Sequence, residues 1–433
     1  MFRISWIKSA AFAALLAHVA APLWAVEPLT LAQAQLIATG RSQQLVAQNA
    51  VTRAARDMAV SAGQLPDPVF KLGVDNLPVT GPEKFSVSRD FMTMRRIGLS
   101  QEITRSDKRQ LKTERFERDA ERAQAQRQLV FAGLQRDTAL AWLELYYSQA
   151  MRILVQQQLE ETRLQGQGAE IAFRSGRGSQ ADVFAARAAV VLQEDRLSQI
   201  DRQSRGAHLM LTRWVGTDAD RPLAGQPVWQ TSAIENILSV EHLKRHSQLG
   251  VVAAQLEAAE TDVRMAQANT KSDWTVEAAY QQRGPSFSNM VSIGVSIPLQ
   301  LDQNNRQNRE VGAKLALVEE AKANYEETLR AHEAEVRGLI NDWQNGKERV
   351  ARYTTQMLPI AMQRTEAALT AYRVGKSDLA ATLTARRDEV DTRIQALTLE
   401  LETARLWAQL NYLAPDSAHT DMQFSPVSVK DKP

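Results

Sequence analysis

A short turn sequence occurs twice in this chain and constrains its fold more than any other feature. The stretch Phe173–Arg187 is repeated by Tyr372–Arg386, and one spacing of 199 residues matches both ends. Gly176 and Gly375 occupy corresponding positions, each between long segments rich in Gln, Glu, Arg, Ala and Leu. Glycine supplies the left-handed backbone that ends a helix. Two ordinary helix–helix turns are the alternative, but a repeat at one fixed spacing favours a duplicated helical hairpin.

The composition points to long helices and excludes several functions. The 433 residues include only 20 glycines and 14 prolines, as is typical of helical proteins. The 52 basic residues are balanced by 50 acidic ones and form no basic block, which argues against nucleic acid as a partner. The absence of cysteine excludes disulfides, thiolate metal sites, cysteine catalysis and a lipidated N-terminal cysteine.

Residues 1–25 have the pattern of a secretory signal peptide. Arg3 and Lys8 form a basic start, and Ala10–Ala21 is an apolar run. Cleavage is expected after Ala25, with Ala21 as the alternative. The run is too short for a membrane anchor, and no later segment offers about 20 consecutive apolar residues. The sequence therefore predicts an exported protein without a membrane-spanning helix.

The remainder divides into two similar halves. Residues 26–216 and 234–414 each have the pattern of two strands, a long helix, a glycine turn and a return helix. A hinge at residues 217–233, rich in proline and glycine, joins them, and residues 415–433 form a tail. Pro359 lies within the helical arm of the second half and should kink or break it. Helical spacing of apolar residues predicts these helices: Leu29–Ala62, Ser106–Gln165, Ala181–Trp214, Leu249–Ala268, Gln307 through Pro359, and a last one ending near Leu413.

Four segments alternate apolar and polar residues, which predicts strands with one apolar face. The second is expected to run from Phe91 to Ile103, and Ile97–Ser100 has the same pattern as Ile293–Ser296. The residues expected on the apolar, membrane-facing side are Phe70, Leu72, Val74, Ile97, Leu99, Trp274, Val276, Tyr280, Val291, Ile293, Val295 and Ile297.

Such strands need a covering that thin helical hairpins do not provide. A closed barrel, with lipid outside and water inside, satisfies both faces and removes the sheet edges. Four strands cannot close a barrel, since known barrels begin at about eight, so several chains must each contribute four. Three chains give twelve strands and four chains give sixteen. The strand patterns alone do not decide between these two assemblies. A small sheet packed on the helices is the alternative.

The fold class expected is therefore mainly α with a small β part, made of long antiparallel helical hairpins and four strands per chain.

From about Leu29 to Leu413 the chain resembles the TolC-type outer-membrane factors of tripartite efflux systems. The resemblance rests on the two similar halves and on the turn pairs Ser175–Gly176 and Val374–Gly375. This resemblance implies a homotrimer with a twelve-stranded β-barrel in outer-membrane lipid and an α-barrel in the periplasm of a Gram-negative cell. It also implies two partners, a periplasmic adaptor protein and an inner-membrane RND pump. The adaptor-docking residues that it implies are Arg174, Gly176, Arg177, Arg373, Gly375 and Lys376.

The chain departs from this family at one place. Some relatives close the tunnel with rings of aspartate just after the second turn, where this chain has Ala381 and Thr384. An acidic, cation-binding gate at these positions is therefore in doubt. Asp378 would replace it only if the turn were built differently.

Leu99–Ile103 followed by Asp107–Arg109 is similar to the heavy-metal branch, the Cus/Czc-type exporters. This similarity implies export of Cu(I) and Ag(I), or of cobalt, zinc and cadmium. Met92 and Met94 would place two thioethers on one side of a strand, as soft metals prefer, although methionine also fills barrel strands.

Other residues give no functional site. His242 and His246 are one helical turn apart and could bind a metal, but such pairs more often lie on a solvated face, and no metal residue is assigned. Gly166–Gly168 lacks the third glycine of a dinucleotide loop, and His332–Glu335 lacks the second histidine of a zinc protease. No cofactor or enzyme activity is expected.

The function expected is a passive exit duct for a proton-driven metal exporter. A duct for organic drugs or secreted proteins is the first alternative. A periplasmic coiled-coil scaffold without a pore is the second.

Overall fold

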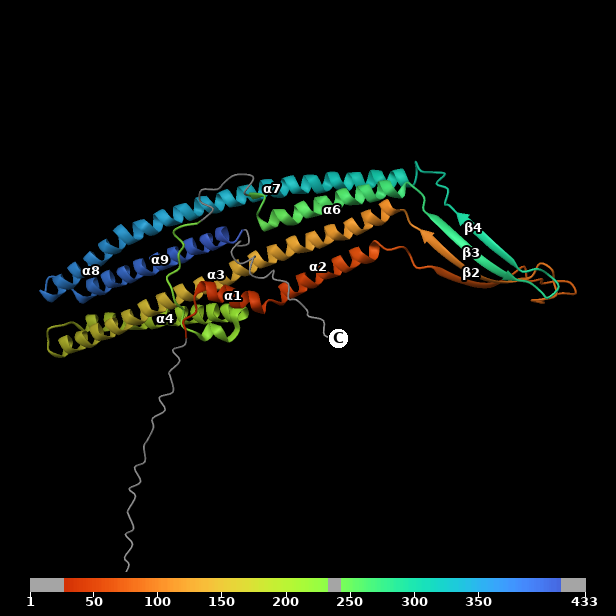
Figure 1. Ribbon diagram of the computed structural model, residues 1–433. Helices are drawn as coiled ribbons and strands as arrows, with labels where there is room; N and C mark the ends of the chain where they lie inside the picture. The colour runs from red at the N-terminus through yellow and green to blue at the C-terminus, as the bar shows by residue number, and fades with distance from the viewer. Residues whose placement is uncertain (1–26, 233–242, 414–433) are drawn as a thin grey trace, which may run out of the picture.

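The chain forms an elongated rod in the computed structural model, which describes residues 27–232 and 243–413 (Figure 1). A β-sheet lies at one end, and two helix turns lie at the other. The expected signal peptide at 1–25 and tail at 415–433 fall outside the described residues. No helix of the described part has an apolar stretch long enough to cross a membrane.

The first predicted helix is two helices, α1 (Leu31–Arg41) and α2 (Gln43–Ala62). The prediction of one helix over Leu29–Ala62 is therefore wrong. Ser42 has an extended backbone, with φ −71° and ψ 107°, and its hydroxyl accepts a hydrogen bond from the Leu45 N–H. A serine that caps the following helix in this way ends the preceding one.

The long helices follow the sequence pattern closely. α3 (Ser106–Arg174) has 69 residues, which corresponds to about 100 Å at about 1.5 Å per residue. It extends beyond the expected end at Gln165, since nothing before the glycine turn stops it. The others are α4 (Gln180–Val215), α6 (Ser247–Asn269), α7 (Gln307–Arg352), α8 (Leu358–Arg373) and α9 (Leu379–Asn411), and a 3-10 turn, Gly216–Asp220, opens the hinge.

The predicted break at Pro359 is confirmed. A π-helical turn, Tyr353–Met357, separates α7 from α8, and Pro359 lies in the first turn of α8. Proline has no N–H to donate to the preceding turn, and its ring clashes with the carbonyl four residues earlier. A π turn at this point accommodates both effects.

The sheet joins the two halves of the chain. Its strands are β1 (Val69–Asp75), β2 (Met94–Ile103), β3 (Trp274–Gln282) and β4 (Met290–Ser296), in the order β1-β2-β3-β4 with every pair antiparallel. The central pairing, β2 with β3, links residues about 180 positions apart, such as Ile97 and Tyr280.

Two strand boundaries differ from expectation. β2 begins at Met94 rather than Phe91, and Ile297 lies just past the end of β4. Asp90 Oδ1 accepts hydrogen bonds from the N–H groups of Met92 and Thr93, which makes a turn where the strand was expected.

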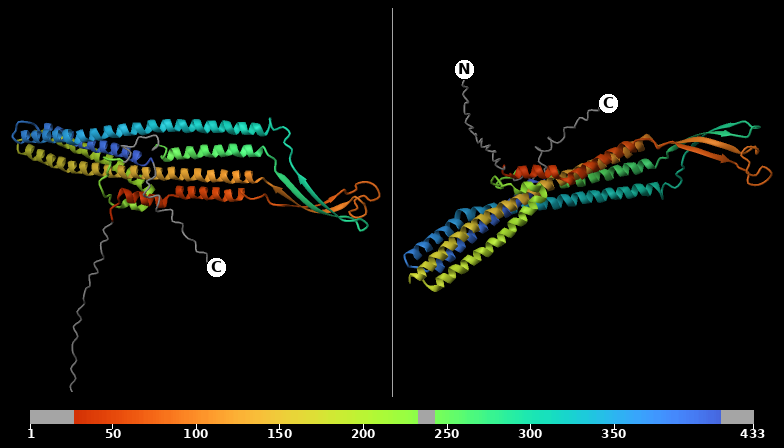
Figure 2. Two further views of the ribbon diagram at one scale, coloured as in Figure 1. Left: turned by 45° about the horizontal axis from the view of Figure 1, so that its top comes forward. Right: turned by 90° about the horizontal axis from the view of Figure 1, so that it is seen from below.

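The largest core lies halfway along the rod, where the helices from both ends overlap (Figure 2). Trp142, Tyr147, Trp229 and Trp343 are almost fully buried there. A smaller cluster joins Ala169 and Val183 to Leu379, so the two glycine turns at the far end are packed side by side.

Candidate functional site

One face of the sheet is apolar and uncovered. The register pairs Phe70 with Leu99, Ile97 with Tyr280, and Tyr280 with Val291, so the apolar residues of all four strands share a face. All twelve residues expected there are exposed, from 39% for Val276 to 78% for Ile293. No described helix covers them, so the alternative of a sheet packed on the helices is wrong.

The opposite face is polar and carries a chain of ion pairs. Lys71 Nζ lies 2.6 Å from Glu277 Oε2. Arg96 lies 3.8 Å from the other oxygen of Glu277 and 3.3 Å from Asp75 Oδ2. These contacts connect β1, β2 and β3, so the sheet has one charged face and one exposed apolar face.

The two glycine turns at the opposite end have the same structure. Gly176 and Gly375 have φ values of +71° and +72°. The Gly176 N–H donates to the Phe173 carbonyl over 3.0 Å, and the Gly375 N–H donates to that of Tyr372 over 3.0 Å. The next N–H in each turn donates over 2.9 Å to the carbonyl five residues earlier. This pattern is a Schellman motif, which explains why glycine stands at both positions.

Polar side chains begin the two return helices. Ser179 caps α4 in a reciprocal arrangement with Asp182. At the corresponding position of the second turn, Asp378 Oδ1 accepts a hydrogen bond of 2.8 Å from the Ala381 N–H. The second turn is thus built like the first, and the Asp378 carboxylate serves as a helix cap.

Cations surround both turns. Arg174 is 76% exposed along its side chain and pairs with Glu170 over 2.7 Å. Arg177, Arg373 and Lys376 are exposed, and none forms an ion pair with another described residue. Arg174 and Arg373 are the last residues of α3 and α8, and Arg177 and Lys376 lie just beyond them. Positive charge is favourable for the helix dipole at these C-terminal ends.

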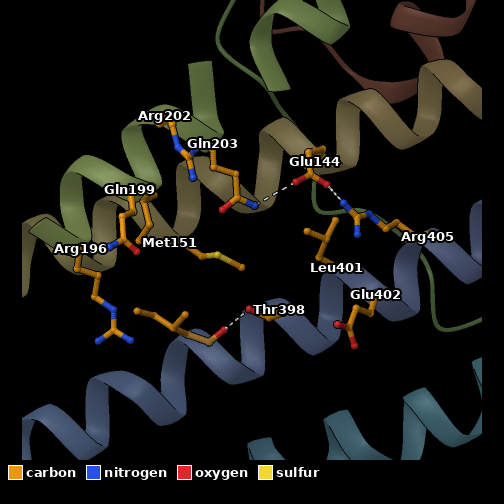
Figure 3. Close-up of a pocket in the computed structure, with 12 residues that line it drawn as sticks. Glu144, Met151, Arg196, Gln199, Arg202, Gln203, Thr398, Leu401, Glu402 and Arg405 are labelled. Atoms are coloured by element: carbon orange, nitrogen blue, oxygen red, sulfur yellow. Dashed lines mark hydrogen bonds and ion pairs between the residues drawn. The ribbon is translucent and has the colours of Figure 1, made fainter. Parts of the chain in front are cut away.

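A groove that the sequence did not indicate lies between α4 and α9, with α3 as its floor (Figure 3). Its volume is about 720 Å³. Glu144 accepts a hydrogen bond from Gln203 over 3.1 Å and pairs with Arg405, and Met151 lies at the base. The groove combines residues of α3 and α4 with residues of α9, which lie about 200 positions or more further along the chain, so no local pattern could have revealed it.

The residues considered for metal binding do not come together as expected. Met92 lies outside β2, and Met94 lies on the polar face two residues before Arg96, so the two thioethers do not share a strand. His242 lies outside the described residues, and His246 precedes α6 rather than lying within it.

His246 is in fact buried, and its Nδ1 lies 2.7 Å from His332 Nε2. It is therefore not on a solvated face. Within the described residues there is no group of three or more His, Cys, Asp or Glu placed to hold a metal ion.

Comparison with known proteins agrees with this architecture. Residues 238–414 match the family model of the outer membrane efflux proteins. No match is found among curated protein sequences.

Solved outer-membrane channels share the fold over most of the chain. The outer-membrane channel OprN is 19% identical, with a TM-score of 0.74 over 89% of this chain and 90% of that one. VceC, an outer membrane protein of Vibrio cholerae, is 20% identical, with a TM-score of 0.71 over 88% and 95%. CusC is 14% identical, with a TM-score of 0.74 over 90% and 94%. The expected fold class of one chain, long helical hairpins with four strands, is confirmed.

Proposed function

We propose that this chain is the outer-membrane exit duct of a tripartite efflux system. The observation that carries the proposal is the two-faced sheet, which has an uncovered apolar side, a charged side and two free edges at the end of a helical rod. A single chain in water would leave the apolar side exposed. In a barrel that crosses the outer membrane, lipid covers it, and the polar side lines the pore.

Three copies are the assembly that we propose, because three chains supply twelve strands, and the resemblance implies a trimer. The helical rods would then form a second barrel that extends into the periplasm. The family match and the similarity to OprN and VceC support this placement.

The two glycine turns are the proposed contact with a periplasmic adaptor protein, which in turn would bind an RND pump in the inner membrane. Both turns lie at the end of the rod farthest from the sheet (Figure 1). Rigid Schellman turns give a fixed surface, and Arg174, Arg177, Arg373 and Lys376 are the exposed side chains around it. The duct itself would be passive, with the energy supplied by the pump.

Heavy-metal cations are the proposed substrates, with Cu(I) and Ag(I) first and cobalt, zinc and cadmium second. The support is the sequence similarity of Leu99–Ile103 and Asp107–Arg109 to the heavy-metal branch. A duct for organic drugs or secreted proteins is the alternative with the same architecture.

Two experiments test these proposals separately. The purified mature chain should form trimers in detergent and conduct ions in planar lipid bilayers. A soluble, non-conducting monomer would instead identify a scaffold without a pore. In a deletion strain, resistance to copper and silver should fall, while unchanged resistance to all five metals would reject the metal substrate and leave the duct intact.

A further inference from the structure

The ion pairs on the polar face of the sheet form a continuous belt across three strands. We infer that the balance of charge within this charge belt, made of Lys71, Asp75, Arg96 and Glu277, sets the ion selectivity of the pore. The inference rests on the proposed barrel, in which the polar face lines the water-filled channel. The four side chains are linked by contacts of 2.6, 3.3 and 3.8 Å, and each is between 30% and 38% exposed.

Glycines allow the belt to lie flat on the wall of the pore. In the register of the strands, Gly98 lies opposite Lys71, and Gly294 lies opposite Glu277. Lys71 on β1 therefore passes over β2 at a position without a side chain and reaches Glu277 on β3. A Cβ at Gly98 would lie 3.1 Å from Ala279 Cβ and 3.2 Å from the Ala278 carbonyl oxygen, so this position has little space for one. Glycine within a strand often marks such a close approach.

Gly73 on β1 lies opposite Arg96 on β2. Arg96 thus also has a residue without a side chain as its cross-strand neighbour, as Lys71 and Glu277 do. With a glycine beside each of three charged residues, the side chains lie along the sheet rather than across the channel. The belt thus leaves the pore open while presenting its charges to passing ions.

The belt is electrically balanced. Its two cations, Lys71 and Arg96, face two carboxylates, Asp75 and Glu277. Three chains would repeat the belt three times around the pore, so removing one charge from each chain leaves three unbalanced charges at one level. Rings of charged side chains of one sign are how pores select between cations and anions.

Measurements of reversal potential in planar bilayers under a KCl gradient test this inference. The dilute side is kept near 0.1 M, where the screening length is about 10 Å. Glu277→Gln leaves an excess positive charge, so the permeability ratio of Cl⁻ to K⁺ should rise. We expect a change of up to about tenfold, the low end of what a single-sign cleft does to local counter-ion concentration. Lys71→Met should change the ratio in the opposite direction.

Two controls separate selectivity from stability. The double variant Lys71→Met with Glu277→Gln is balanced again and should return to the wild-type ratio. Arg95→Gln should leave the ratio unchanged because Arg95 lies on the apolar face. Arg96, the next residue in the strand, lies on the polar face, so Arg96→Gln should lower the permeability ratio of Cl⁻ to K⁺. If Glu277→Gln does not assemble, Lys71→Met and Arg96→Gln test the same belt through its cations.

The outcomes distinguish this inference from the proposed function. A wild-type chain that does not conduct would reject the duct and the belt together. A conducting wild type, whose single-charge variants conduct equally well with an unchanged permeability ratio, would reject the belt alone.

Discussion

The indole nitrogen of Trp343 donates a hydrogen bond of 2.9 Å to the backbone carbonyl of Trp229. The first half of the chain contains the same relationship, because Trp142 on α3 donates over 3.1 Å to the carbonyl of Leu29. Trp229 also donates from its own indole to the Tyr147 hydroxyl over 2.9 Å. In both halves, a buried tryptophan thus fixes the segment that enters the middle of the rod.

Trp343→Phe should lower the free energy of unfolding by about 1–3 kcal/mol, because the buried Trp229 carbonyl would lose its partner. Denaturant unfolding of the detergent-solubilised protein measures this change. Trp214→Phe is the matched control, since Trp214 is half-buried and its indole nitrogen has no hydrogen-bond partner among the described residues. Equal losses in the two variants would show that the hydrogen bond to Trp229 is unimportant.

Gly346→Ala should destabilise the contact of α7 with α9. A Cβ at Gly346 would lie 2.6 Å from the hydroxyl oxygen of Thr403, which is fully buried and bound to the Leu399 carbonyl. Overpacking of this kind costs about 1–3 kcal/mol. Gly338→Ala, on the same helix with open space around it, should instead stabilise by about 0.5–1 kcal/mol. Thermal unfolding of both variants gives the comparison, and a stabilised Gly346→Ala would contradict the packing argument.

Gly176→Pro should abolish export while leaving insertion into the outer membrane intact. Proline fixes φ near −65°, whereas Gly176 has φ +71° and uses its N–H in the turn. Metal resistance and the amount of protein in outer-membrane fractions are the two measurements. Gly168→Ala in the neighbouring stretch of α3 should change neither. Normal resistance in Gly176→Pro would count against the docking role of the turn.

Ile293→Arg should reduce assembly in the membrane much more than Ser292→Arg. The two residues are neighbours on β4, and the register places Ile293 on the apolar face and Ser292 on the polar one. An arginine facing lipid at the bilayer midplane costs about 2–4 kcal/mol. The fraction of folded trimers in liposomes gives the result, and similar assembly of the two variants would argue that lipid does not cover the apolar face.

Glu400 gives a pH-dependent prediction. Burial raises the pKa of its carboxyl, and burial also raises the pKa of the neighbouring Tyr147 hydroxyl. Because the folded protein holds this proton more tightly than the unfolded chain, the stability that Glu400 contributes is fully present below the ordinary glutamate pKa of about 4.3. It is lost as the pH rises through the raised value.

Glu400→Gln cannot ionise, so its melting temperature should exceed that of the wild type by a margin that grows as the pH rises from 4 towards neutrality. Glu402→Gln, at a residue that lines the open groove, is the control (Figure 3). A margin that does not change with pH would reject this assignment for Glu400.

The sequence predicted the elements better than it predicted their contacts. The apolar face of β1 follows from strict alternation at Phe70, Leu72 and Val74. The Gly176 turn follows from its repeated pattern. Sequence reasoning misses the break at Ser42, although serine is a good helix cap. It also misses the capping box of Thr30 and Gln33, which places the start of α1 at Leu31. Apolar periodicity continues across Ser42, and that pattern outweighed the cap.

The remaining features depend on packing between distant residues. Lys71 and Glu277 are 206 positions apart, and the groove in Figure 3 brings Glu144 to Arg405 across 261. No local sequence pattern carries this information, because it arises only when β2 pairs with β3 and when α9 packs on α3.

The strand order also has a consequence for how copies of the chain can join. Three antiparallel pairings separate β1 from β4, so the two edge strands run in opposite directions. In the proposed barrel, the β4 strand of one copy would therefore meet the β1 strand of the next in the same antiparallel sense, whatever the number of copies. Hydrogen bonding allows rings of several sizes, and the copy number has to be set by how strongly each sheet curves and by the angle between neighbouring rods.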